Sequence, residues 1–260
     1  MRKLMLVTVM VLVTVMLPMS VLADADNPVP QRLDKATIAS MSVAELEAKS
    51  TELRAVKDFA GAKPLLQEAT RRQPKNASLF NKLGMVELQL HEWDAALNHF
   101  SKATKLNPKY PEALNNVGTG YFLKGNYDAA AKYYRKALAL DETRAVFHAN
   151  LAAAWISKDK LNLALTEYAR ALELDPDVLV NNNRTGIAAQ VSTPEQRANR
   201  FFLLARVFAI RGDVNGALDF LRKAKEEGYR DLESVYKQKE FANLWQDQRL
   251  AELVPPAKGK

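Results

Sequence analysis

The sequence predicts an all-α fold, a right-handed α-solenoid of helix-turn-helix repeats closed by C-terminal capping helices. The first observation is internal similarity, because small and aromatic residues recur when the chain is aligned on itself at an offset of 34 residues. This offset superimposes Gly84 on Gly118, Ala96 on Ala130 and Ala164, Phe100 on Tyr134 and Tyr168, and Ala103 on Ala137 and Ala171. The second observation is composition, since 260 residues with 48% hydrophobic side chains can bury a large core.

The unit 77–110 illustrates why each recurring position has its residue type. Gly84 lies on the apolar side of a first helix, where the missing side chain allows a second helix to approach closely. Ala96 and Ala103 are small for the same reason on the second helix, and Phe100 fills the space between units. Pro108 ends the second helix and starts the next turn.

The period and the order of residues resemble the tetratricopeptide repeat family. The shared pattern is Leu-Gly early, an aromatic residue next, then alanine, a second aromatic, alanine and a closing proline. Three clear units carry it, at 77–110, 111–144 and 145–178, the second with Glu142 in place of the closing proline. The resemblance implies stacked helix pairs, and three units are enough for a stable stack.

The flanking segments carry weaker versions of the pattern. Residues 43–76 form a degenerate repeat with Lys49 and Ser50 in place of Leu-Gly, and Ser42 with Glu45 predicts a capping box where its first helix begins. Residues 179–197 are an insertion, and 198–228 resume a repeat-like unit. Residues 229–253 are expected to form capping helices, and 254–260 a tail.

The N-terminus has the pattern of a signal peptide over residues 1–23. Arg2 and Lys3 precede an uncharged apolar run, and Ala23 and Ala25 offer cleavage after residue 23 or residue 25. An uncleaved membrane anchor is the alternative, because the uncharged run is long enough to span a bilayer. Residues 24–42 are expected to be a linker. The pattern therefore predicts an exported, periplasmic protein, with secretion and membrane anchoring left open.

Charge and motifs argue against several functional classes. The formal net charge of +7 is spread along the chain with acids between the bases, which is typical of solvated helix faces rather than of a nucleic-acid partner. The absence of cysteine excludes disulfides and thiolate metal sites. His91, His99 and His148 lack metal-binding spacing. We therefore expect no metal, no cofactor and no catalytic residues, and the protein is predicted not to be an enzyme.

The resemblance implies a concave groove lined by residues of the first helices. The positions that correspond to this lining are Asn81, Lys82, Met85, Gln89, Asn115, Asn116, Thr119, Phe122, Asn150, Ala153 and Ile156. Asparagine can donate to and accept from a peptide backbone, whereas Met85, Phe122 and Ile156 can receive its side chains.

One binding mode of the family is a cluster of lysine, asparagine and arginine that grips a C-terminal carboxylate. The corresponding positions here hold Asn81, Met85, Asn116, Val146 and Asn150, so only Asn116 matches. Recognition of an acidic chain terminus is therefore not expected in this groove.

The sequence thus predicts a non-catalytic protein-protein interaction scaffold of the cell envelope, which binds a peptide or a partner protein in its concave groove. Two alternatives are a chaperone-like or assembly subunit for exported proteins and an enzyme that uses the 179–197 insertion. A deep pocket beside Arg184 with convergent carboxylates would favour the enzyme.

Overall fold

The computed structural model describes residues 33–178 and 193–256. The predicted signal peptide, residues 24–32 of the predicted linker and most of the insertion, including Arg184, lie outside these ranges. Within them, no helix is both long and apolar enough to cross a membrane.

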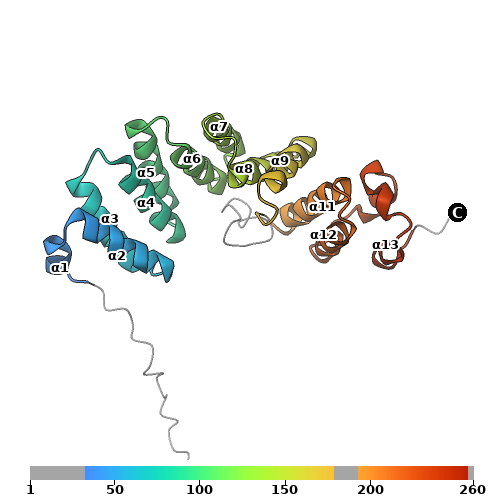
Figure 1. The fold of residues 1–260 in the computed structure, drawn as a ribbon, viewed down its shortest axis with the longest axis horizontal. Helices are drawn as coiled ribbons and strands as arrows, with labels where there is room; N and C mark the ends of the chain where they lie inside the picture. Colours follow the sequence, from blue (N-terminus) through green and yellow to red (C-terminus); the bar gives the residue numbers. More distant parts are fainter. Residues whose placement is uncertain (1–32, 179–192, 257–260) are drawn as a thin grey trace, which may run out of the picture. The chain divides into compact units, whose positions relative to one another are not determined.

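The described chain is an all-α solenoid, with helices and no strand in the two described ranges (Figure 1). Short α1 (Lys35–Ser40) precedes five helix pairs. These are α2 (Val43–Ala55) with α3 (Phe59–Arg72), α4 (Ala77–Gln89) with α5 (Trp93–Leu106), α6 (Pro111–Leu123) with α7 (Tyr127–Leu138), α8 (Ala145–Ser157) with α9 (Leu161–Leu174), and α11 (Pro194–Ile210) with α12 (Val214–Glu226). From α2 to α9 each helix packs against the next one along the chain, α9 packs against α11 and α11 against α12, and α1 packs against α3.

The first pair begins with the predicted capping box, which the structure confirms. The Ser42 side chain accepts a hydrogen bond from the Glu45 amide, and the Glu45 carboxylate accepts one from the Ser42 amide. Ser50 is fully buried at the position where the other units have glycine or alanine, and its hydroxyl donates to the Glu47 carbonyl. A small polar residue is therefore tolerated there because the preceding turn supplies its acceptor.

Close approach within each pair depends on the small residue of the first helix. A Cβ atom added to Gly84 would lie 2.7 Å from the Phe100 ring, and one added to Gly118 would lie 2.6 Å from the Tyr134 ring. Both rings are fully buried. The next pair has Ala152 at the glycine position, with Tyr168 also fully buried.

The C-terminal segment closes the last pair with three short helices, in the region where the sequence predicts capping helices. These are η1 (Leu232–Tyr236), η2 (Lys239–Leu244) and α13 (Gln248–Leu253), and the first two are 3-10 helices. Phe241, Leu244 and Leu250 are fully buried in one core with α8, α9, α11 and α12. The Trp245 indole donates to the Val235 carbonyl at 3.0 Å, which fixes η2 against η1.

Neighbouring pairs are also joined by an ion pair that repeats with the 34-residue period. Lys124, at the end of α6, pairs with Asp94 of α5, and Lys158, at the end of α8, pairs with Asp128 of α7. Both aspartates are largely exposed. Such surface pairs contribute little stability, so they mark the shared register rather than hold the units together.

Candidate functional site

The predicted binding residues come from three successive first helices, α4, α6 and α8, which contact one another in that order. We call the side of the molecule formed by these helices the first-helix face. Each pair contributes the same helix positions to it because the repeat has a constant length. The eleven predicted residues therefore form a row across neighbouring units.

A chain of asparagine side chains runs across this row. The Asn116 amide donates to the Asn81 side-chain oxygen at 2.9 Å, and the Asn150 amide donates to the Asn115 oxygen at 2.9 Å. Asn115 donates to Asn116 at 3.4 Å, which joins the two contacts. We call these four residues the asparagine chain. It connects α4, α6 and α8 through side chains alone.

The predicted set divides by burial. Asn81, Asn115, Thr119, Phe122, Asn150, Ala153 and Ile156 are buried, Lys82 and Asn116 are half-buried, and Met85 and Gln89 are exposed. Lys82 is paired with Glu47 of α2. Phe122 and Ile156, expected to receive partner side chains, belong instead to the cores between units. The accessible part of the set is therefore confined to α4 and α6.

The amide groups of the asparagine chain are used within the protein. Buried polar groups are costly unless hydrogen-bonded, and three of these four side chains are buried. Asn150 ends the chain, and its side-chain oxygen has no hydrogen-bond partner in the described ranges. Asn81 and Asn115 thus have a structural use that the sequence did not indicate, and a role of this set in partner contact stays a prediction.

Tyr134 and Tyr168 are equivalent buried tyrosines whose hydroxyl groups have different surroundings. The Tyr134 hydroxyl lies 3.3 Å from the Thr119 hydroxyl, to which it donates. Tyr168 occupies the same position in the next unit, but Ala153 replaces the threonine and the Tyr168 hydroxyl has no partner in the described part of the chain. Burial raises the pKa of Tyr168 to about 12. Both phenols are therefore protonated packing residues near neutral pH.

Two of the histidines make contacts inside single helix pairs. His99 Nδ1 lies 2.6 Å from the carboxylate of buried Glu87, and His148 Nδ1 lies 2.6 Å from that of Glu167. His91 has a φ of 60° in the turn after α4. No group of potential metal ligands gathers among the residues that the structure describes.

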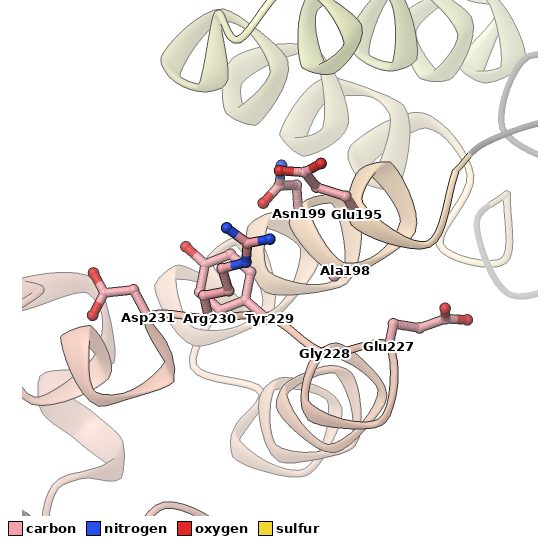
Figure 2. A pocket seen from close by; sticks show the side chains of 8 residues that line it. All are labelled: Glu195, Ala198, Asn199, Glu227, Gly228, Tyr229, Arg230 and Asp231. Atoms are coloured by element: carbon pink, nitrogen blue, oxygen red, sulfur yellow. The ribbon is translucent and has the colours of Figure 1, made fainter.

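The structure also has a pocket that the sequence did not reveal, between α11 and the connection from α12 to η1. Its volume is about 390 Å³, and it is lined by Glu195, Ala198, Asn199, Glu227, Gly228, Tyr229, Arg230 and Asp231. Figure 2 shows Glu195 and Asn199 side by side on α11, with Arg230 and Tyr229 facing them. The Tyr229 ring stacks on Phe202 with 4.2 Å between ring centroids.

Two charged groups of this pocket have neighbours that shift their protonation. Glu227 makes two hydrogen bonds to Arg197, which lower the pKa of this carboxyl. Burial raises the pKa of Tyr229, and the negative charge of Asp231 raises it further. Figure 2 shows the Glu227 and Asp231 side chains on opposite sides of the view. No sequence signal marked the site, because its residues come from two segments about 30 positions apart.

Comparisons with known proteins agree with this architecture. Residues 48–111 and 81–145 match the model of a tetratricopeptide repeat family. The matched segment, 48–145, consists of tetratricopeptide repeats. It contains α3 to α7 and most of the first-helix face, but less than half of the chain. A comparison with curated protein sequences finds no match.

Solved structures extend the likeness of fold beyond the matched segment. A thermophilic tetratricopeptide repeat protein of Thermus thermophilus is 18% identical, with a TM-score of 0.52, over 78% of this chain and 99% of that chain. MamA from Desulfovibrio magneticus RS-1 is 18% identical, with a TM-score of 0.52, over 73% and 97% of the two chains. Another MamA structure is also 18% identical, with a TM-score of 0.50, over 76% and 95%. The fold is that of a tetratricopeptide repeat solenoid.

The structural use of the asparagine chain predicts the effect of Asn115→Ala. This change removes both of its side-chain links and leaves the buried Asn150 amide unpaired, so we expect a loss of about 1–3 kcal/mol in the free energy of unfolding. Chemical denaturation followed by circular dichroism measures it. Asn162→Ala, on the exposed side of α9, is the matched control and should change stability by less than about 0.5 kcal/mol. Equal effects would contradict the role of the chain.

Proposed function

We propose that the protein is a non-catalytic protein-interaction scaffold, which binds a peptide or a partner protein on the accessible part of its first-helix face. That part is the surface around Met85, Gln89, Asn116 and Lys82, on α4 and α6. The observation that carries the proposal is Met85, an apolar side chain that is 38% exposed in the row of otherwise buried apolar first-helix residues.

The surroundings of Met85 suit a protein ligand. The Asn81 amide nitrogen lies 3.9 Å from the Met85 sulfur, so the side chain lies next to the asparagine chain. Methionine is flexible and polarisable, and it adapts to partner side chains of different shape. Gln89, one turn further along α4, is exposed and has donors and acceptors for a peptide backbone. An apolar centre with a polar rim is typical of protein interfaces.

The buried members of the predicted set support this surface indirectly. The hydrogen bond from Asn116 to Asn81 holds α6 at a fixed position beside α4. A surface that is ordered before binding loses less conformational entropy when the partner docks. We therefore assign Asn81, Asn115 and Asn150 to positioning, and Met85, Gln89 and Asn116 to contact.

The proposal predicts that Met85→Glu weakens partner binding without loss of folding. A carboxylate at the centre of the contact must be desolvated on binding, which costs at least about 1–3 kcal/mol, or roughly tenfold or more in Kd. Affinity capture from envelope extracts, followed by titration of the captured partner, measures the change. Leu163→Glu is the matched control, because Leu163 is an exposed apolar residue on second helix α9.

Loss of capture in both variants, or in neither, would contradict the first-helix face as the contact surface. Thermal unfolding of both variants checks that folding is intact. Neither substitution removes a buried side chain, so their unfolding temperatures should stay close to that of the wild type.

We also propose that the scaffold acts in the cell envelope, after export. The support is the pattern of Arg2 and Lys3 followed by an apolar run and by alanines at 23 and 25. Expression with the intact N-terminus in a bacterial host should give periplasmic protein, and its intact mass should lack the first 23 or 25 residues. Full-length protein in the cytoplasmic fraction would contradict export.

A further inference from the structure

A second surface of the molecule lies on α7, on the side of the pairs formed by second helices. It is a hollow of about 420 Å³ lined by Asp128, Ala131, Lys132, Arg135, Lys136, Ala139 and Trp155. We call it the Trp155 hollow. All but one of these residues belong to α7 or directly follow it, and Trp155 comes from α8.

The hollow results from the spacing of residues along α7. Positions 128, 131, 132, 135, 136 and 139 follow the pattern i, i+3, i+4, i+7, i+8 and i+11, so they lie on one side of the helix. Ala131 and Ala139 are short, whereas Lys132, Arg135 and Lys136 are long and exposed. Trp155 supplies the one large aromatic surface.

The three cations of the hollow that belong to α7 have no acidic partner among the described residues. Lys132, Arg135 and Lys136 make no ion pair within the described ranges. Lys136 makes a cation–π contact, with its ammonium 5.0 Å from the centre of the Tyr133 ring. Some cations on other second helices are paired instead, as Arg71 on α3 and Arg170 on α9 are with glutamates on their own helices.

Two further lysines extend the positive charge around Trp155. The Lys160 ammonium lies 5.2 Å from the centre of the Trp155 ring, and the Lys158 ammonium lies 6.0 Å from it. Asp128 is the one carboxylate in the lining, and it is paired with Lys158. Asp159 lies between the two lysines in sequence and is exposed. The balance of charge in the hollow is therefore positive.

We propose that the Trp155 hollow binds an acidic segment of a partner polypeptide. The side chains of Lys132, Arg135 and Lys136 would pair with glutamate or aspartate, and an apolar or aromatic residue of the segment would contact the half-buried Trp155 ring. The stripe from Asp128 to Ala139 is about 17 Å long at the rise of an α-helix. This length accommodates about five residues of extended chain.

The chemistry of the hollow favours a polypeptide over a nucleic acid. Single-stranded nucleic acids are bound by several aromatic platforms in succession along a long basic groove. Here there is a single half-buried tryptophan, and the run of unpaired cations on α7 covers one turn. The proposal extends the scaffold function to a second surface, made by helices other than those around Met85.

Binding to a short fluorescein-labelled peptide of glutamates around one central phenylalanine tests the proposal in the full chain. We expect saturable binding in fluorescence anisotropy that weakens as salt is added. The triple variant K132E/R135E/K136E should weaken it about tenfold or more, because each exposed pair contributes up to about 1 kcal/mol. A matched peptide of glutamines should not bind.

The triple variant K75E/K105E/K109E is the control for net charge. Its three lysines are exposed, and the change in net charge is the same. We expect less than about a twofold change in this control. The indole resonance of Trp155, assigned by its loss in Trp155→Phe, should shift when the acidic peptide is added.

Several outcomes would overturn the proposal. These are absence of saturable binding, equal loss in both triple variants, or an unmoved Trp155 resonance. Tighter binding of single-stranded DNA or of phosphatidylglycerol vesicles, abolished by K132E/R135E/K136E, would assign the hollow to another ligand. Met85→Glu should leave peptide binding here unchanged, so failure at one surface can be told from failure at the other.

Discussion

The close contact between a buried aromatic ring and a residue with little or no side chain is the constraint on which the three central units depend. Phe100 lies where a Cβ atom of Gly84 would be, and Tyr134 lies where one of Gly118 would be. Neither pair of helices could approach as closely with a larger residue at the glycine. Because the contact recurs every 34 residues, it also gives successive pairs the same geometry. The row of first-helix residues across neighbouring units follows from this repetition.

Repetition has a consequence for binding. Equivalent positions of neighbouring first helices come close enough for their side chains to meet, and the asparagine chain from Asn81 to Asn150 is the result. Polar residues that could contact a peptide are therefore used between helices instead. The surface left for a partner is narrower than the row of predicted residues. It contains Met85 and Gln89, with Asn116 at its edge.

Much of the fold could be predicted from the sequence, because small and aromatic residues at a fixed period mark the positions where paired helices pack together. The capping box at Ser42 is likewise local and is confirmed. Burial across units was harder to predict. Whether Asn115 faces solvent or Asn150 depends on the distance between neighbouring first helices, which no pattern within one unit reveals.

The Trp155 hollow and the pocket between α11 and η1 could not be predicted for the same reason, because each combines residues of different helices or segments. Trp155 occupies a repeat position that is normally a packing position, and its ring does contact the core. Its exposed part has a function only in the context of Lys132 and Arg135 on another helix. The pocket between α11 and η1 also requires segments brought together by folding.

The central claim, that the accessible part of the first-helix face binds the partner, is tested most directly by hydrogen–deuterium exchange with and without the captured partner. The account predicts slower exchange in peptides that cover Ala77–Gln89 and Pro111–Leu123, with little change in Leu161–Leu174. Protection confined to second helices, or none over α4 and α6 at saturating partner, would contradict it.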